Sequence, residues 1–410
     1  MEKKESIIIL GGSRPHAELI KYLRSKNYRT ILVDYLPNPP AKDVADIHYQ
    51  DSSLDVEAVE RIAKEEMATH IMCICTDRAI PPAAYVAERL HLPHPYSYDT
   101  SLIATNKNKM KSMLCGAGIP TSRFFQINSV SQIDEIKLKF PLIVKPSDAS
   151  GSIGITKVDK IEDLKSAVEY ALQTSRNGQA IVEEFIVGTE IQMDCFISDG
   201  QLYILDIKEK RKMSIEELSL SFGSLIPARI SDQQKNRCVE ISNKTAESLK
   251  IANGPLYIQA IANEADVFVV EFGLRFGGNL SFKILKDISG VDIIKATAEA
   301  YLGLSNEIHP FTDFKDVYAT FHIFPKKGQF KCITGYEQLL NDGTLEVFHI
   351  NKSTGLICEG NMTSKERLAS FIIRSKSIEG VNRKLRRVLE EVEVLDEQNK
   401  PIMRKDIYVL

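Results

Sequence analysis

The stretch that decides the fold runs from residue 256 to residue 279 and reads LYIQAIANEADVFVVEFGLRFGGN. Two apolar runs flank a polar turn at residues 263–266, and this pattern predicts a β-hairpin. A strand projects alternate side chains to the same side, so Glu271, Gly273 and Arg275 are expected to share one face. A carboxylate and a guanidinium are therefore expected side by side on a strand that is otherwise apolar.

The length of the turn decides which residues of the two strands face each other. If residues 264–266 form the loop, Gln259 lies directly opposite Glu271, about 5 Å away. Burying a lone carboxylate is costly, so this face calls for a cation. Amide and carboxylate oxygens without Cys or His suit Mg²⁺ and not zinc. The simpler alternative is an ion pair between Glu271 and Arg275 on a half-exposed strand.

The overall composition is that of an ordinary globular protein. The chain has 410 residues, which suggests two or three domains, and its hydrophobic and charged contents are 43% and 26%. A net charge of −3 gives no indication of nucleic-acid binding. The seven cysteines lack zinc-site spacing and are expected to be reduced and packed. The charged start and the short apolar run after it predict neither a signal peptide nor a membrane span, so a cytoplasmic protein is expected.

Residues 7–100 alternate between strand and helix patterns, which predicts a parallel sheet with helices on its faces. Strands are expected at residues 7–10, 30–33 and 70–75, with helices after the glycine turn and over residues 56–64 and 83–90. Ligands of such sheets bind at the carboxyl ends of the strands, which here carry Gly11, Gly12, Ser13, Asp34 and Asp77. A dinucleotide site is another interpretation, but the turn GGSRPH lacks two glycines of the G-x-G-x-x-G fingerprint.

The central part of the chain contains two lysines at the ends of predicted elements. Lys107 lies in the first turn of a helix, where a cation opposes the helix dipole, so an anionic partner or plain exposure is expected. Lys145 ends a buried-type strand at residues 140–145. Small residues and glycines follow at residues 150–154, and their backbone N–H groups could cover a phosphate. No Walker A pattern occurs, which excludes the ordinary P-loop.

The remaining patterns predict further strands and one smaller α+β unit. Residues 180–186 form a strand run, and residues 191–198 alternate apolar and polar side chains, with a hairpin turn at 198–201. The basic run at residues 208–212 is most simply a solvated loop, with the border of a substrate site as the alternative. The last hundred residues indicate strands near residues 317–324, 331–334, 344–350 and 368–374, then a helix over residues 378–392.

Several motifs follow one another along the chain. They are an Asn-Lys pair before a helix ending AGIP, then VKPSDASGSIG, EEFIVGTE, and a Gln/Glu strand pair ending in E-x-G-x-R-x-G-G. Each motif is loose, but together the chain resembles an ATP-grasp enzyme over nearly its whole length. The resemblance implies an α/β and α+β fold with three domains. These are a Rossmann-like pre-ATP-grasp domain at residues 1–104, a two-lobed ATP-grasp domain at 105–305 with a mobile lobe at about 121–187, and a biotin carboxylase-like α+β domain at 306–410.

Carried over onto the matching positions, the resemblance implies a nucleotide site. The phosphates are expected to contact two lysines and a glycine loop, namely Lys107, Lys145, Ser150, Gly151, Ser152 and Gly154. The linker that reads adenine, mainly through backbone groups, corresponds to Glu183, Glu184, Phe185 and Ile186. The carboxylate that binds the ribose corresponds to Glu190.

The same resemblance implies a metal site and a substrate site. Gln259 and Glu271 match the Mg²⁺ ligands, with Mn²⁺ as an alternative, while Arg275 matches the arginine that steadies the acyl phosphate and is taken as catalytic together with Lys145. Substrate contacts are expected from the strand ends, the basic run and the glycine motif, namely Gly11, Gly12, Ser13, Asp77, Lys210, Arg275, Gly277 and Gly278. Many ATP-grasp enzymes have Asn where this chain has Gly273. One metal ligand is thereby lost, which leaves the number of ions open and favours the amino-acid ligases of the family.

The function implied by the resemblance is an ATP- and Mg²⁺-dependent ligase that joins a small carboxylate to an amine through an acyl phosphate. One alternative is a carboxylase or formyl-transferring step on a phosphoribosyl amine, similar to phosphoribosylglycinamide synthetase. Another is an ATP-binding sensor that has lost turnover, with Gly273 as its main support. Small-molecule substrates are the expected partners, without nucleic acid or membrane, and analogy with the family suggests a homodimer.

Overall fold

The computed structural model describes residues 4–149, 153–215, 218–278, 280–308, 315–361 and 363–408. The chain falls into two compact units, each assembled from three separate segments. Unit 1 comprises residues 1–121, 193–206 and 231–311, and unit 2 comprises residues 122–192, 207–230 and 312–410. The α/β and α+β fold class is confirmed. The three domain boundaries expected from the sequence stay a prediction.

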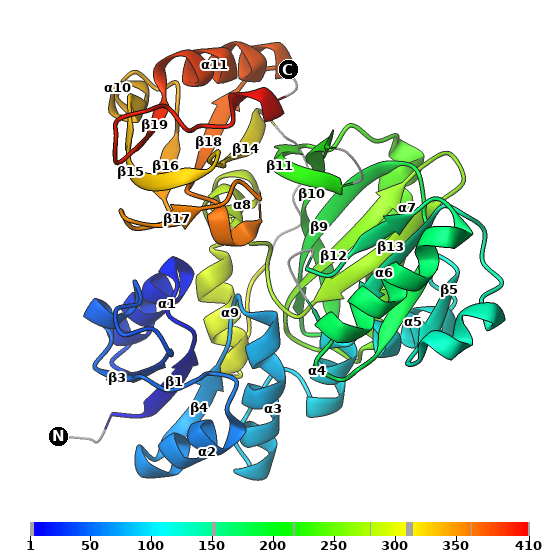
Figure 1. The fold of residues 1–410 in the computed structure, drawn as a ribbon. Coiled ribbons are helices and arrows are strands. Elements are labelled where there is room, and N and C mark those ends of the chain that lie inside the picture. Colours follow the sequence, from blue (N-terminus) through cyan, green and yellow to red (C-terminus); the bar gives the residue numbers. More distant parts are fainter. Residues whose placement is uncertain are drawn as a thin grey trace. The chain divides into compact units, whose positions relative to one another are not determined.

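Unit 1 contains the predicted parallel sheet, in the order β3-β2-β1-β4. Its elements are β1 (Ser6–Leu10), α1 (Arg14–Ser25), β2 (Arg29–Val33), β3 (Ile47–Tyr49), α2 (Val56–Glu65), β4 (Ala68–Met72) and α3 (Ile80–Arg89). Helix α1 packs on β2, whereas α2 and α3 pack on β4 (Figure 1), and strand β1 is buried along its whole length. Strand β4 ends three residues earlier than predicted, and just past its end the Cys73 carbonyl accepts a hydrogen bond from the Tyr301 hydroxyl at 2.7 Å.

The rest of unit 1 combines helices with an antiparallel hairpin. The helices are α4 (Tyr98–Thr105), α5 (Lys107–Gly116), α7 (Asp232–Ser248), α8 (Ser281–Ser289) and α9 (Ile293–Tyr301), and the hairpin strands are β12 (Gly254–Ala262) and β13 (Val267–Gly273). The side chain of Asn106 caps α5 by accepting a hydrogen bond from the Lys109 amide at 3.1 Å. Lys107 is therefore the first residue of this helix, as predicted.

Strands β9 (Thr189–Ser198) and β10 (Gln201–Ile215) form the predicted hairpin and contribute residues to both units. Although apolar and polar side chains alternate along β9, residues 191–198 are buried on both faces of the strand. Its polar side chains have partners: Asp194 accepts from the Gly277 amide at 2.7 Å, and Ser198 donates to the Asn306 carbonyl at 2.7 Å. The solvated-loop interpretation of residues 208–212 is also wrong, because this run continues β10.

Unit 2 includes a small antiparallel sheet in the order β5-β8-β6-β7. Its strands are β5 (Phe124–Ile127), β6 (Leu142–Pro146), β7 (Thr156–Val158) and β8 (Ala180–Glu184), and helix α6 (Ile161–Thr174) lies between β7 and β8 in the sequence. Helix α6 covers the sheet with Leu164 and Val168, which pack in one cluster with Val144 and Val182. Lys145 and Glu183 lie on the neighbouring strands β6 and β8, and this pairing positions them for the site described below.

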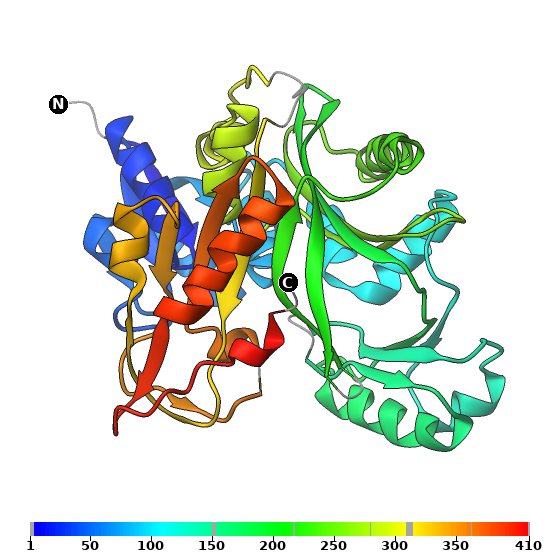
Figure 2. The ribbon, with the colours of Figure 1, turned by 90° about the horizontal axis from the view of Figure 1, so that it is seen from above.

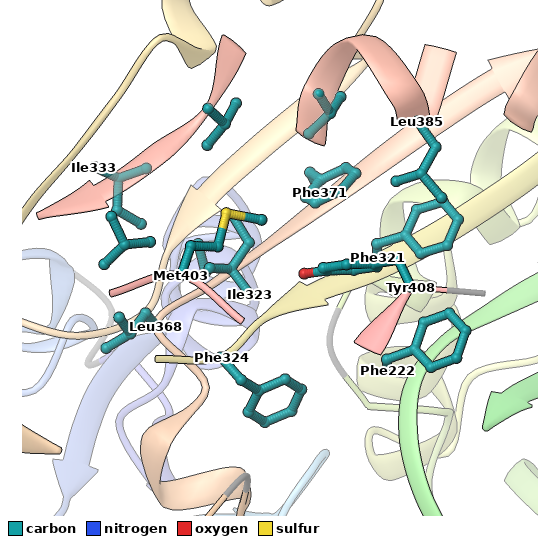
Figure 3. Packing of buried hydrophobic residues seen from close by; sticks show 14 of the residues in the cluster. Phe222, Phe321, Ile323, Phe324, Ile333, Leu368, Phe371, Leu385, Met403 and Tyr408 are labelled. Carbon is teal, nitrogen blue, oxygen red and sulfur yellow. The ribbon is translucent and has the colours of Figure 1, made fainter. Parts of the chain in front are cut away.

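The other part of unit 2 is the predicted α+β unit, with strands in the order β10-β11-β14-β18-β16. Its further elements are β11 (Leu218–Ile226), β14 (Val317–Ile323), β15 (Gly328–Thr334), α10 (Tyr336–Asn341), β16 (Val347–Ile350), β17 (Ile357–Cys358), β18 (Ala369–Ser375), α11 (Ile378–Glu391) and β19 (Glu393–Asp396). Helix α11, orange-red in Figure 2, packs on β14 and β18. Phe321, Phe371 and Leu385 meet in the core beneath it (Figure 3). No helix within the described ranges is both long and apolar enough to cross a membrane.

Candidate functional site

The β12–β13 hairpin places Gln259 opposite Glu271, as predicted, but by a different route. The strands close at Ala262 and Val267, so residues 263–266 all belong to the turn and the expected three-residue loop is wrong. A β-bulge next to Gln259 inserts one extra residue into β13, and this insertion restores the predicted pair. The register of the amide and the carboxylate therefore depends on the bulge as well as on the turn.

The same bulge decides which side of β13 is buried. Before it, Val267 and Val269 are buried, and after it, Phe272 and Leu274 are buried. An inserted residue shifts the alternation of a strand by one position. Glu271 consequently lies on the less buried face, where a carboxylate can contact a ligand.

Arg275 pairs with Asp77, which follows β4 at the carboxyl edge of the parallel sheet. Its Nε donates to Asp77 Oδ1 at 2.6 Å and its Nη2 donates to Asp77 Oδ2 at 2.8 Å. Such a bidentate pair fixes the plane of the guanidinium. Burial opposes the charge of Arg275, but Asp77 outweighs it and raises the pKa of Arg275 above its ordinary value. The partner of Arg275 is thus Asp77 and not Glu271, the partner in the simpler sequence interpretation.

Tyr257 completes this cluster from strand β12, where it lies directly opposite Gly273. A Cβ atom at position 273 would lie 2.3 Å from Cε1 of the Tyr257 ring and 2.9 Å from Asp77 Oδ1. The guanidinium carbon of Arg275 is 4.3 Å from the ring centroid, and the Tyr257 hydroxyl is 3.5 Å from Glu271 Oε1. Burial, reinforced by the charge of Glu271, raises the pKa of Tyr257 well above its ordinary value. We call these five residues, Asp77, Tyr257, Glu271, Gly273 and Arg275, the Arg275 cluster.

Arg275 keeps part of its hydrogen-bonding capacity within this cluster. A guanidinium has five N–H donors. Two donate to Asp77 and one, on Nη1, donates to the Phe276 carbonyl at 2.9 Å. Considering only the described residues, one N–H on each Nη nitrogen remains, and the side chain is 16% exposed. The remaining pair of donors can bind an oxyanion.

The two glycine segments predicted to contact substrate have structural roles of their own. The Gly277 amide donates to Asp194, while a Cβ added at Gly278 would have no atom within 4 Å. Gly11 adopts a φ of +105°, which favours glycine, and a Cβ at Gly12 would lie 2.4 Å from Pro39. Packing alone therefore explains Gly11 and Gly12, and their contact with substrate stays a prediction.

A polar group lies beside the glycine turn of unit 1. Ser13 Oγ is 2.8 Å from His16 Nδ1, and Cys75 Sγ is 3.7 Å from Ser13 Oγ. Burial lowers the pKa of His16 to about 4 and raises the pKa of Cys75 to about 12. Both groups are therefore neutral near pH 7, and they line the strand ends without adding charge.

In unit 2, Lys145 forms a buried trio with Glu183 and Ser122. Lys145 Nζ donates to Glu183 Oε1 at 2.9 Å, and the Ser122 hydroxyl donates to Glu183 Oε2 at 2.6 Å. All three residues are less than a tenth exposed. The family resemblance assigns Lys145 to the phosphates and Glu183 to adenine. The structure brings these two side chains together.

The predicted adenine linker uses some of its backbone groups within the protein. The amide of Glu184 donates to the Arg123 carbonyl, and the amide of Phe185 donates to the Pro141 carbonyl, both at 2.9 Å. The amides of both linker residues are therefore already bonded within unit 2. Glu190, the predicted ribose ligand, is ion-paired with Lys212 of β10.

The remaining predicted phosphate and substrate residues of unit 2 lie on β10 and in the loop after β6. Lys210 lies on β10 opposite Ser224. Gly154 adopts a φ of +75° close to Pro146. The loop residues Ser150, Gly151 and Ser152 lie outside the described residues.

Tyr257 is the residue of this site that the sequence interpretation missed. The pairing of Gln259 with Glu271, extended by two residues along each strand, places Tyr257 opposite Gly273. The signal was therefore present in the predicted register. The Asp77–Arg275 pair had no comparable signal, because 198 positions separate its members.

Comparison with known proteins supports the family resemblance. Residues 138–283 match the family model of the ATP-grasp domain. The carbamoyl phosphate synthase large chain of Thermoanaerobacter sp. (strain X514) is 27% identical over 211 residues, which is 50% of this chain and 19% of that protein. Among the curated relatives compared, the chain spans between 13% and 27% of their length.

Two solved structures share the fold. The L-amino acid ligase of Bacillus licheniformis is 20% identical with a TM-score of 0.81, and the match covers 97% of this chain and all of that chain. The biotin carboxylase domain of the Hydrogenobacter thermophilus 2-oxoglutarate carboxylase, a dimer in complex with MgADP, ADP and bicarbonate, is 15% identical with a TM-score of 0.77. That match covers 99% of this chain and 93% of that chain. At these identities the likeness shows the fold.

Proposed function

Because the chain carries an ATP-grasp domain, we propose that it is an ATP-dependent ligase that joins a small carboxylate to an amine through an acyl phosphate. The observation that carries the proposal is the placement of Gln259 opposite Glu271, on the strand that leads into Arg275. An amide oxygen, a carboxylate and a cationic oxyanion donor are the groups that such a phosphoryl transfer requires.

The residues around Glu271 fit a magnesium ion. Gln259 and Glu271 offer oxygen ligands only, and Mg²⁺ prefers oxygen ligands, with Mn²⁺ as an alternative. Among the described residues, no group of three or more His, Cys, Asp or Glu side chains could hold a metal by itself. Mg²⁺ in proteins keeps waters and substrate phosphates as ligands, so two protein ligands suffice. When bound, the ion would neutralise charge on the nucleotide phosphates.

The proposed reaction has two steps. A carboxylate oxygen attacks the γ-phosphorus of ATP, the bond to ADP breaks, and an acyl phosphate forms. The amine nitrogen then attacks the carbonyl carbon and loses a proton, and inorganic phosphate leaves. Catalysis of this kind depends on positioning and charge neutralisation, and it needs no covalent bond to the protein.

Arg275 would stabilise the charge that develops on the substrate oxygens. Its plane is fixed by Asp77 and its two remaining N–H groups lie on the Nη nitrogens. Because the guanidinium is already oriented, little reorganisation is needed during the reaction. Losing one such donor typically costs about 10²–10³ in rate.

In unit 2, Lys145 would contact the nucleotide phosphates. Its ammonium group is held by Glu183, and an ammonium carries three donors, so a phosphate oxygen can be added without breaking that bond. Ser122 satisfies the other oxygen of Glu183, which keeps the carboxylate in place. Glu183 is therefore proposed to orient Lys145, while the carbonyls of the linker would contact adenine.

The substrates proposed are two amino acids or similar small molecules. The fold shared with the L-amino acid ligase and the missing side chain at Gly273 support this choice. A homodimer is proposed by analogy with the dimeric biotin carboxylase domain.

A phosphate-release assay with ATP and Mg²⁺ tests the function. The panel contains pairs of amino acids, bicarbonate, and a phosphoribosyl amine with bicarbonate or formate. We expect ADP and phosphate to form with particular amino-acid pairs, together with a product whose mass is the sum of the pair minus water. Release with a phosphoribosyl amine instead would replace the proposal with the purine-type reaction. If the protein binds ADP but no substrate combination supports turnover, the nucleotide-sensor alternative would replace the proposal.

A further inference from the structure

Gly273 and Tyr257 form a matched pair within the Arg275 cluster. The two residues are directly opposite each other, and the ring occupies the space of any side chain at position 273. Aromatic rings commonly cover a glycine on a neighbouring strand, which is the plain structural explanation. Here the covering ring also lies 4.3 Å from the guanidinium carbon of Arg275, so it does more than fill space.

The ring supports the guanidinium from a direction that Asp77 leaves open. Asp77 binds the Nε–Nη2 edge of the group, whereas the guanidinium carbon lies over the ring of Tyr257, 4.3 Å from its centroid. Tyr257 is 6% exposed, and strand pairing fixes its backbone, so the ring has little freedom to move away. The two bonds to Asp77 and the contact with the ring together hold the two remaining N–H donors in one orientation.

The hydroxyl of the same ring points to the predicted metal ligand. Tyr257 Oη is 3.5 Å from Glu271 Oε1, which is the outer limit of a hydrogen bond. One side chain therefore touches both the arginine and the glutamate of the site.

We propose that Tyr257 is a positioning residue of the ligase site, and that Gly273 is required because any larger residue displaces the Tyr257 ring from beneath Arg275. The expected effects on kcat rest on the proposed ligase function. The loss of a metal-binding side chain at position 273 is then explained by the space that Tyr257 takes, and not by decay of the site.

Four variants test the pair. Gly273→Ala adds one methyl group in the space of the ring, Tyr257→Ala removes the ring, and Tyr257→Phe removes only the hydroxyl. The fourth is the double variant Tyr257→Ala/Gly273→Ala. Gly116→Ala is the matched control, because no atom lies within 4 Å of a Cβ at that position and it adds the same methyl group.

The kinetic expectation follows from the geometry. Gly273→Ala and Tyr257→Ala should each lower kcat by about ten- to a hundredfold with the KM for ATP little changed, because the oxyanion donors are misplaced. Gly116→Ala should keep the wild-type kcat, and Tyr257→Phe, which keeps the ring, should lower kcat far less than Tyr257→Ala does. Adding Gly273→Ala to Tyr257→Ala should lower kcat by much less than Gly273→Ala does in the wild type, since the methyl group then has no ring to displace and meets only Asp77 Oδ1, at 2.9 Å. If the kcat defects of the two single variants multiply in the double variant, Tyr257 and Gly273 act independently and the inference is overturned.

A second measurement does not need turnover. In protein labelled with ¹⁵N-arginine, the Nε–H signal of Arg275, assigned by its loss in Arg275→Lys, should be protected from exchange by its bond to Asp77. We expect this protection in the wild type and Tyr257→Phe, and its loss in Gly273→Ala and Tyr257→Ala. Unchanged protection in Gly273→Ala would overturn the inference. If no substrate pair supports turnover, the proposed function fails while this measurement still decides the role of Tyr257.

Discussion

Asp77 and Arg275 are joined by two hydrogen bonds of 2.6 and 2.8 Å, although 198 positions of sequence separate them. The pair ties the end of strand β4 to the segment that follows β13. Both side chains are partly buried, at 26% and 16% exposure. The contact explains how an arginine with an apolar neighbourhood keeps its charge, and it fixes the direction of the donors that remain.

Asp77→Asn should destabilise the protein and impair the proposed reaction. The asparagine amide is uncharged and has only one oxygen, so it can accept only one of the two hydrogen bonds from Arg275. Allowing for partial exposure, we expect the free energy of unfolding to fall by about 1–2 kcal/mol. Urea denaturation measures this loss. Glu18→Gln is the control, because the Glu18–Lys21 pair is half-exposed and its removal should cost less than about 0.5 kcal/mol. Equal effects would show that the Asp77 pair is an ordinary surface contact.

Glu271→Gln should weaken binding of the divalent cation while leaving the hairpin intact. The substitution keeps the shape of the side chain but removes the charge that Mg²⁺ or Mn²⁺ would bind. Titration of Mn²⁺ by calorimetry in the presence of ADP should show an affinity at least about tenfold lower, since second-shell changes alone can cost that much. Glu264→Gln, in the exposed turn of the same hairpin, should have no effect. Unchanged affinity in Glu271→Gln would remove this residue from the metal site.

Much of the fold could be predicted from local patterns in the sequence. The βαβ order of unit 1, the hairpin at residues 254–273 and the strands of the last hundred residues follow from periodicity and turn residues. The position of Lys107 in the first turn of a helix was readable in the same way. These features depend on neighbouring residues, which is why one sequence suffices to find them.

The bulge and the buried pairs could not be read in this manner. Nothing in the run VFVVEF marks where an extra residue leaves the ladder, and the correct pairing of Gln259 with Glu271 came from a loop length that was wrong. The contact of Lys145 with Glu183 depends on how two separate strands align. Tertiary packing decides such contacts, whereas strand propensity does not distinguish between them.

Lys145→Met should separate the structural role of Lys145 from its proposed role in nucleotide binding. Glu183 would be left buried with Ser122 as its hydrogen-bond donor, and breaking a buried pair typically costs about 3–5 kcal/mol. The double variant Lys145→Met/Glu183→Gln should recover much of this stability, because no unpaired charge remains. Binding of ATP should stay weak in both variants. If the double variant recovers ATP affinity as well as stability, Lys145 does not contact the nucleotide and only stabilises the folded protein.

Stability should fall as the pH drops from about 6.5 to about 4, with His16 as one cause. Burial lowers the pKa of folded His16 from 6.5 to about 4, so in this range the unfolded chain binds a proton that the folded protein does not. The contribution of His16 is complete above pH 6.5 and is lost on acidification, by at most about 3 kcal/mol at 1.36 kcal/mol per pKa unit. In His16→Asn, the fall in unfolding free energy between pH 7 and pH 5 should be smaller. Parallel wild-type and variant curves over that interval would contradict this assignment.

Thiol alkylation at pH 8 should distinguish Cys115 from Cys75. Cys115 is exposed, whereas Cys75 is half-buried beside Ser13 and His16, and burial raises its pKa to about 12. Only the thiolate reacts, so about one molecule in 10⁴ carries a reactive Cys75 at this pH. Mass spectrometry after brief iodoacetamide treatment should find Cys115 modified well before Cys75, and Cys115→Ser should remove the rapid phase. Labelling of Cys75 at the rate of Cys115 would mean that the strand-end group stabilises a thiolate, which would make it a chemically active part of the site.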